Sequence, residues 1–159
     1  MERQADWRQE KAQALARARV VIKVGSAVLT DAQGLSTPVL ESLARQMAAL
    51  RIAPDGHERR LVLVSSGAVA AGRAVLRAHG HSGETSGLSA RQAAAAVGQG
   101  QLMRAWDEVF RAYDFPTSQV LLTRDDLRAR QRFLNARNTF AELMDWGVLP
   151  IVNENDTVS

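Results

Sequence analysis

The sequence predicts an α/β fold in which helices pack on a mainly parallel sheet. Three apolar runs each end in a short polar or glycine-containing corner, and they occupy residues 20–26, 61–67 and 148–156. Segments with apolar residues at helical spacing separate these runs, as expected when helices connect parallel strands. The composition is 46% hydrophobic but only 5% aromatic, which suits helices on a buried sheet. A chain of 159 residues has the length of one domain with a single core.

Charge and composition argue against several classes of protein. The pI is about 10.1, but the formal net charge is only +3 because 20 basic residues are dispersed among 17 acidic ones. This dispersion disfavours a nucleic-acid-binding domain. The absence of cysteine excludes disulfides and thiolate metal sites and is compatible with the cytoplasm, where we expect the protein. No apolar run reaches the roughly 18 residues of a membrane span, and residues 1–18 form a charged N-terminal extension.

The first half of the chain alternates strands and helices. Residues 20–24 are expected to form the first strand. Thr37 is the expected N-cap of the next helix, with Pro38 at the first helical position. The second strand, residues 61–65, leads into an alanine-rich helix that starts at Gly67. Strand, helix, strand and helix is the order of a crossover connection.

A polar connection over residues 79–88 precedes a long helix. It contains His79 and His81, for which we expect a solvated loop rather than a metal site. Ser89 and Gln92 have the spacing of a capping box at the start of the long helix.

Two glycines, Gly98 and Gly100, lie within this long helix and indicate either a break or a close helix contact. Its second half carries apolar and aromatic residues on one face, which we expect in the core: Leu102, Met103, Trp106, Val109, Phe110 and Tyr113.

The last third of the chain repeats the pattern of strand and helix. Residues 120–122 are expected to form a strand, and Asp125 or Asp126 to cap the helix beyond it. Residues 133–144 form a further amphipathic helix before the final apolar run. Five arginines make a local basic cluster, which is either a solvated helix face or subunit contact, or an anion site: Arg124, Arg128, Arg130, Arg132 and Arg137.

Lys23 interrupts the first apolar run. The chain has 18 arginines but only two lysines, and a buried ammonium is costly without a partner. Its place two residues before Gly25, at the end of a strand, therefore indicates a phosphate or carboxylate partner. The alternative is a lysine that reaches solvent at the edge of the sheet. Gly25 and Ser26 add backbone N–H groups that form an anion-binding nest beside it.

The second corner suggests another anion site. Gly67 lets a ligand approach the backbone, the helix N-terminus offers unpaired N–H donors, and Ser66 supplies a hydroxyl group. The alternative for Ser66 is an ordinary helix N-cap. A P-loop is excluded because Arg73 stands where its lysine is required, and the glycines at residues 98–100 follow a helix, unlike a dinucleotide-binding fingerprint.

The third corner, residues 153–156, places carboxylates directly after a buried strand. Carboxylates repel an acidic ligand but pair with an ammonium group. Together with the two anion-binding corners, they indicate a zwitterionic ligand, with Asp156 for the amino group and Ser66 with nearby N–H donors for a carboxylate. The alternative for Asp156 is a turn or cap residue.

Five segments together resemble the amino acid kinase family, and within it the members that phosphorylate L-glutamate: residues 22–26, 64–72, 96–99, 132–139 and 150–156. This resemblance implies a three-layer αβα sandwich, incomplete at the C-terminus. It implies transfer of the γ-phosphoryl group of ATP, with Mg²⁺ on the nucleotide, to the side-chain carboxylate of L-glutamate. The product would be L-glutamyl 5-phosphate, the first step of proline biosynthesis.

The resemblance also implies roles for individual residues. Lys23 matches the family's catalytic, phosphate-binding lysine, and Gly25 and Ser26 lie beside it at the ATP phosphates. The residues that match the substrate-binding positions, or lie next to them, are Ser66, Gly67, Asn153 and Asp156.

The expected domain organisation follows from the same comparison. Residues 1–18 have no assigned counterpart, and residues 19–159 correspond to the N-terminal, amino-acid-binding part of the kinase domain. The nucleotide-binding half, a second catalytic lysine and, in many members, an RNA-binding-like domain would lie beyond residue 159, so we expect the chain alone to be inactive. The resemblance further implies a homo-oligomer, a dimer or tetramer, and feedback inhibition by proline.

Other functions stay open at the level of sequence. One is another member of the family, acting on aspartate, acetylglutamate, carbamate or UMP. A second is a non-catalytic amino-acid-binding module, and a third is a nucleic-acid contact through the arginines of residues 124–137. No metal site is expected on this chain, and neither is a membrane partner.

Overall fold

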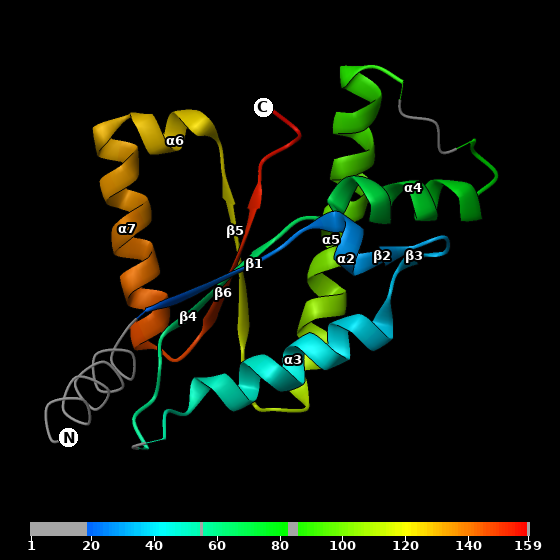
Figure 1. Cartoon of the computed structure of the whole chain (residues 1–159). Helices are drawn as coiled ribbons and strands as arrows, with labels where there is room; N and C mark the ends of the chain where they lie inside the picture. Colours follow the sequence, from blue (N-terminus) through cyan, green and yellow to red (C-terminus); the bar gives the residue numbers. More distant parts are fainter. Residues whose placement is uncertain (1–18, 55, 83–85, 159) are drawn as a thin grey trace, which may run out of the picture.

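The computed structural model describes residues 19–54, 56–82 and 86–158, so the extension expected over residues 1–18 lies outside the described residues. A four-stranded sheet forms the centre of the fold, in the order β1-β4-β6-β5 (Figure 1). All neighbouring strands in it are parallel. The strands are β1 Val20–Val24, β4 Leu61–Ser65, β5 Thr117–Leu122 and β6 Leu149–Glu154. The three predicted runs are adjacent strands, which confirms that their carboxyl ends meet at one edge of the sheet.

Helices lie on both faces of the sheet, which confirms the predicted α/β class and its three layers (Figure 1). α3 (Thr37–Arg51) and α5 (Leu88–Arg111) lie on one side, and α7 (Arg130–Asp145) lies on the other. The remaining elements are α2 Ser26–Leu29, α4 Ala68–Ala78, α6 Arg124–Arg128 and the antiparallel pair β2 Thr30–Asp31 and β3 Gly34–Leu35.

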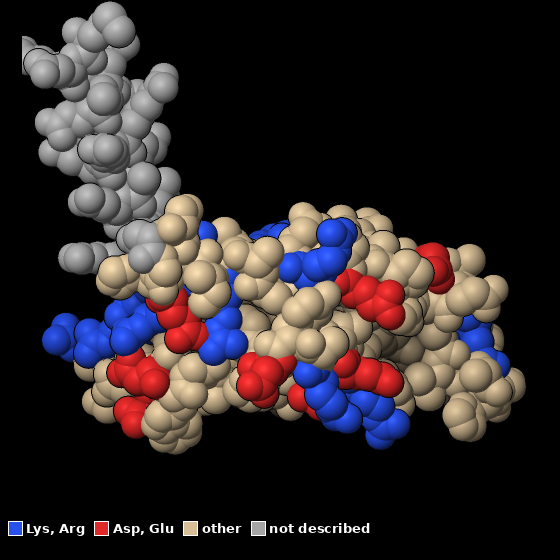
Figure 2. All heavy atoms as spheres, turned by 90° about the horizontal axis from the view of Figure 1, so that it is seen from below, with Lys and Arg blue, Asp and Glu red and all other residues tan. Residues whose placement is uncertain are grey.

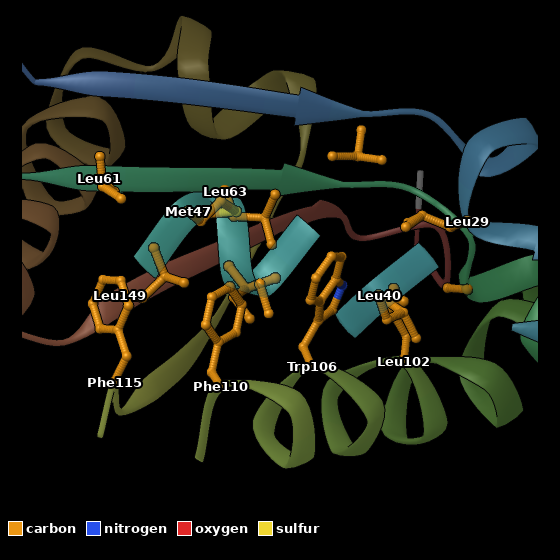
Figure 3. Packing of buried hydrophobic residues seen from close by; sticks show 14 of the residues in the cluster. Leu29, Leu40, Met47, Leu61, Leu63, Leu102, Trp106, Phe110, Phe115 and Leu149 are labelled. Carbon is orange, nitrogen blue, oxygen red and sulfur yellow. The ribbon is translucent and has the colours of Figure 1, made fainter. Parts of the chain in front are cut away.

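The main core lies between the sheet and the pair α3 and α5. Figure 3 shows Leu102, Trp106 and Phe110 pointing from α5 toward the strands, and all three are fully buried. The rings of Trp106 and Phe110 stack with centroids 5.7 Å apart. The predicted apolar face of α5 is therefore confirmed for these residues. Tyr113 is 38% exposed, because α5 ends at Arg111 and the chain turns away before it.

Two helices begin differently from the predictions. Ser36 rather than Thr37 is the N-cap of α3, and its carbonyl oxygen accepts the N–H of Leu40 at 3.1 Å. Gly87, with φ of 102°, is the N-cap of α5. Ser89 consequently lies inside the first turn, and the predicted capping box does not form.

A capping box does form at α6, with a different residue at the N-cap. Thr123 is the N-cap, and its hydroxyl oxygen accepts the N–H of Asp126 at 3.3 Å. Asp126 accepts hydrogen bonds in return from the N–H and the hydroxyl group of Thr123, both at 2.7 Å. Asp126 thus stabilises the helix start as predicted, but from the third helical position.

α4 and α5 cross at two glycines. A Cβ on Gly98 would lie 1.9 Å from the carbonyl oxygen of Ala68, and one on Gly72 would lie 1.8 Å from that of Ala94. The helices can approach this closely only because both positions lack a side chain. The predicted close contact is confirmed for Gly98, whereas Gly100 has open space around it and α5 continues through both positions without a break.

α7 is more exposed than its amphipathic pattern predicted. The helix expected over residues 133–144 is present within α7, but none of its residues is fully buried and Phe133 is 45% exposed.

Basic and acidic side chains alternate over the face shown in Figure 2, in line with the dispersed charge of the sequence. No helix in the described part of the chain has the length and apolar character needed to span a membrane.

Candidate functional site

The carboxyl ends of β4 and β6 border a hollow of about 600 Å³, which we call the strand-end pocket. Five of the residues predicted to form the site line it: Ser26, Ser66, Gly67, Asn153 and Asp156. They come from three distant parts of the sequence, and the parallel order β1-β4-β6 brings them together. The expected convergence is observed for these five residues.

Lys23 lies beside the strand-end pocket but does not line it, and its side chain is exposed. The expectation of a buried ammonium is wrong, because β1 is an edge strand of the described sheet and this face of it is open. Lys23 is the register neighbour of Val64, which does line the pocket. Side chains at matched positions of adjacent strands point to the same face, so Lys23 is placed next to the pocket. Gly25 follows it with open space on its Cβ side.

The Ser66–Gly67 corner presents a helix N-terminus to the pocket. Gly67 is the N-cap of α4 and has φ of 117°, a conformation that favours glycine. The N–H of Ser66 donates to the carbonyl oxygen of Val24 at 3.0 Å, which ties β4 to β1. The first turn of α4, residues 68–70, lines the pocket, and the N–H groups in the first turn of a helix have no acceptor within the helix. These N–H groups and the helix dipole favour an anion.

Two consecutive hydrogen bonds connect the Ser66–Gly67 corner to α5. Nε1–H of Trp106 donates to Oγ of Ser65 at 2.9 Å, and the Ser65 hydroxyl donates to the carbonyl oxygen of Ser66 at 3.2 Å. Both Trp106 and Ser65 are buried. The apolar spacing predicted Trp106 only as a core residue, since a helical pattern carries no signal for its indole partner.

Asn153 is held against α5 by a residue to which the sequence assigned no role. Its Nδ2–H donates to Oε1 of Gln99 at 2.8 Å. Among the described side chains, Nε2 of Gln99 is the one buried nitrogen or oxygen without a hydrogen-bond partner. A buried donor without an acceptor costs free energy, and this one lies next to Asn153, which lines the pocket. The signal available in sequence was the motif at residues 96–99.

Asp156 sits in an electrostatic environment prepared for a cation. Burial raises the pKa of Asp156, and the neighbouring Glu154 carboxylate raises it further, whereas the Arg91 guanidinium acts in the opposite direction. Both effects that raise the pKa disfavour a bare carboxylate. An ammonium group bound between Glu154 and Asp156 would remove much of that penalty.

A second hollow of about 640 Å³, here called the arginine hollow, adjoins the strand-end pocket. Its basic residues are Arg91, Arg124, Arg128 and Arg132. It shares Val69, Arg91, Glu154 and Asp156 with the strand-end pocket. Arg132 pairs with Asp126 at 3.3 Å. Hydrogen bonds from Thr123 lower the pKa of Asp126, and Arg132 acts in the same direction. Three of the five clustered arginines therefore border a cavity, whereas Arg130 and Arg137 do not line it.

Metal binding has no prepared site on the described residues. No group of three or more His, Asp or Glu side chains among them could hold a metal ion. His79 and His81 are exposed on the connection after α4, where a solvated loop was expected.

The arrangement can bind and orient a small zwitterion. N–H donors at α4 suit a carboxylate, the pair Glu154 and Asp156 suits an ammonium group, and Lys23 beside β4 suits a further anionic group such as a phosphate. No histidine lines either hollow. The titratable acids that line both hollows are Glu154 and Asp156.

Comparison with known proteins adds an independent finding. Residues 18–159 match the model of the amino acid kinase family. The chain is 57% identical over 155 residues to a protein named glutamate 5-kinase from Nitratidesulfovibrio vulgaris, and the match covers 97% of this chain and 39% of that relative. It is 56% identical to the glutamate 5-kinase of Oleidesulfovibrio alaskensis, with the same coverage. The glutamate 5-kinase of Geobacter sulfurreducens is 50% identical over 141 residues, covering 88% of this chain and 36% of the relative.

The matched ranges also concern the N-terminal residues of this chain and the length of its relatives. The first two extend into residues 1–18, to which no counterpart had been assigned. The chain spans about two fifths of the length of these curated relatives.

Proposed function

Because the chain belongs to the amino acid kinase family, we propose that it binds L-glutamate and orients its side-chain carboxylate for phosphorylation by ATP. The product of the whole enzyme is L-glutamyl 5-phosphate, which feeds proline biosynthesis. The match to proteins named glutamate 5-kinase supports this choice of amino acid over aspartate, acetylglutamate, carbamate and UMP.

One observation carries the proposal: the strand-end pocket joins a helix N-terminus to a carboxylate pair. Ser66, Gly67 and the first turn of α4 lie at one wall, and Asn153, Glu154 and Asp156 lie at another. An amino acid with an ionised side chain needs this combination of donors and acceptors. We assign the substrate carboxylate that reacts to Ser66 and the α4 donors, and the ammonium group to Asp156 with Asn153 beside it.

The chemistry requires alignment rather than a general base. The side-chain carboxyl of glutamate has an ordinary pKa of about 4.3, so it is ionised at neutral pH and its oxygen can attack phosphorus directly. The protein must bring two anions together in line and offset their repulsion. Lys23 is placed to offset that charge, and the backbone of Gly25 and Ser26 to hold the transferred phosphoryl group.

ATP is the phosphoryl donor that a kinase implies, and Mg²⁺ would neutralise charge on its phosphates. The described residues offer Lys23, Gly25 and Ser26 to the phosphates but no metal-binding group. We therefore assign Mg²⁺ to the phosphates of the nucleotide. Since the relatives are longer, we propose that the 159-residue chain binds glutamate but does not complete the transfer alone.

The test is a titration of the 159-residue chain with L-glutamate, followed by isotope-edited NMR so that millimolar affinities are measured. We expect saturable shifts at the amides of Ser66, Gly67, Asn153 and Asp156. D-glutamate and L-glutamine, which differ in handedness or in side-chain charge, serve as control ligands. Absence of any saturable glutamate-dependent shift would overturn the proposal, and equal binding of all three ligands would reduce it to a nonspecific anion site.

The other functional expectations stay proposals that rest on the resemblance. They are a cytoplasmic location, a homo-oligomer and inhibition by proline. A competitive proline titration in the same NMR experiment tests the last of these, because proline bound in the strand-end pocket would displace glutamate. Sedimentation of the chain tests assembly.

A further inference from the structure

The two hollows meet at a single arginine. Of the arginines among the described residues, Arg91 lines both the strand-end pocket and the arginine hollow, together with Glu154 and Asp156. Arg73 lines only the strand-end pocket, and Arg124, Arg128 and Arg132 line only the arginine hollow. Arg91 therefore lies where the two hollows join, at the same place as Asp156, the residue to which the ammonium group is assigned.

We propose that Arg91 determines specificity by pairing with the α-carboxylate of the bound amino acid. This inference rests on the proposed function, and it adds a residue and a selectivity that the family match does not assign. It predicts that the strand-end pocket prefers an amino acid with two carboxylates to an analogue that lacks the α-carboxylate.

The connectivity of an α-amino acid supports this assignment. Its ammonium group and α-carboxylate are attached to the same carbon, so a cation must lie close to the groups that bind the ammonium. Arg91 meets this condition, because it is close enough to Asp156 to act on it electrostatically. The side-chain carboxylate, at the far end of the molecule, then lies toward Ser66 and the first turn of α4 in the strand-end pocket. One molecule would satisfy all three groups.

The position of Arg91 within α5 gives a second reason. It lies in the first turn of the helix, where its N–H donates to the carbonyl oxygen of Gly87 at 3.3 Å. A positive charge at a helix N-terminus opposes the helix dipole and destabilises the helix slightly. The side chain is also exposed, so packing does not account for it. The side chain borders both hollows, where its charge can act on a bound carboxylate.

The experiment compares two ligands on the 159-residue chain. L-Glutamate has all three charged groups, and 4-aminobutyrate has the ammonium and one carboxylate but no α-carboxylate. We expect the wild-type chain to bind glutamate more tightly. Arg91→Gln should weaken glutamate about tenfold or more, as expected for loss of a charge-assisted hydrogen bond, while 4-aminobutyrate affinity stays unchanged.

Two further variants separate charge from geometry and from nonspecific effects. Arg91→Lys keeps the charge but loses the planar donor pair, so it should restore only part of the selectivity. Arg104→Gln removes an exposed arginine of the same helix that lines neither hollow, and it should leave both affinities unchanged. Thermal unfolding of each variant checks that the fold is kept, since surface substitutions usually change stability by no more than about 0.5 kcal/mol.

The outcomes are distinguishable. If wild type binds glutamate but Arg91→Gln leaves the ratio of the two affinities unchanged, the assignment of Arg91 is wrong and the proposed function stands. An equal loss for both ligands would likewise overturn it, because Arg91 would then act through Asp156 or through the fold. If wild type binds neither ligand, the proposed function fails, and this inference fails with it.

Discussion

Substitution of Gly98 by alanine should be among the most damaging single-methyl changes in this chain. The added Cβ would lie 1.9 Å from the carbonyl oxygen of Ala68 and 2.3 Å from the nitrogen of Gly72, whereas real Cβ atoms essentially never come within 3.0 Å. Both neighbours are backbone atoms, so no side chain can rotate away. The two helices must separate by about 1 Å, which places the cost at the upper end of overpacking, about 3 kcal/mol.

A free energy of this size is readily measured by thermal or urea unfolding. For a domain of this length, each 1 kcal/mol lowers Tm by about 2–4 °C, so Gly98→Ala should lower it by about 6–12 °C. Gly100→Ala is the matched control, because it lies in the same helix with nothing within 4 Å of its Cβ. Alanine is the better helix former by about 1 kcal/mol, so the control should be slightly stabilising. A Gly98→Ala chain as stable as Gly100→Ala would refute the close crossing of α4 and α5.

Four other substitutions test the site. Asp156→Asn should weaken glutamate binding yet raise Tm at pH 7: since the pKa of Asp156 is raised in the fold, the stability its carboxyl contributes in acid is lost as pH rises through that pKa, and an unchanged Tm difference between pH 4 and 7 would contradict this. Trp106→Phe removes the hydrogen bond to Ser65 and part of a fully buried side chain, so in urea unfolding it should cost more than the roughly 1 kcal/mol of the hydrogen bond alone; a smaller cost would show that the bond does not stabilise the fold. Gly67→Ala should cost about 1–2 kcal/mol, measured in the same way, because φ is 117° there. Lys23→Met should leave glutamate Kd unchanged by calorimetry, whereas a large loss would place the lysine at the amino acid.

The sheet was predictable because three of its four strands carry strong local signals. Residues 20–24, 61–65 and 149–152 combine apolar character with corners that end the strands, and parallel order follows from the helices between them. Helix starts were less predictable. Gly87 begins α5 through its positive φ, which competes with the serine-based capping box at Ser89 and can be recognised only once the loop conformation is known.

The burial of individual side chains could not be predicted from the sequence either. Lys23 interrupts an apolar run, and that pattern cannot distinguish a central strand from an edge strand. The order β1-β4-β6-β5 leaves β1 at an edge, so Val21 is 63% exposed and Lys23 is exposed beside it. Strand order depends on contacts between distant segments, which periodicity within one segment does not encode.

The site residues were partly predictable for a similar reason. Ser66, Gly67 and Asp156 follow strands closely and Asn153 lies near the end of β6, and strand ends in a parallel sheet converge. Arg91, Gln99 and Trp106 lie in the middle or start of a helix, where sequence spacing indicates only a face. Their position at or near the strand-end pocket depends on the α4–α5 crossing, which orients the face of α5 that carries them.

Three features at or next to the strand-end pocket are compatible with a ligand site, and none of them depends on a resemblance. Gly67 holds a positive φ, Asp156 has a raised pKa, and Nε2 of Gln99 is buried without a partner. The core around Trp106, by contrast, satisfies its polar group through Ser65. The raised pKa of Asp156 disfavours its ionised form, and a bound ammonium group would offset that cost. The positive φ of Gly67 is a conformation that glycine adopts readily, and it brings the first turn of α4 to the pocket.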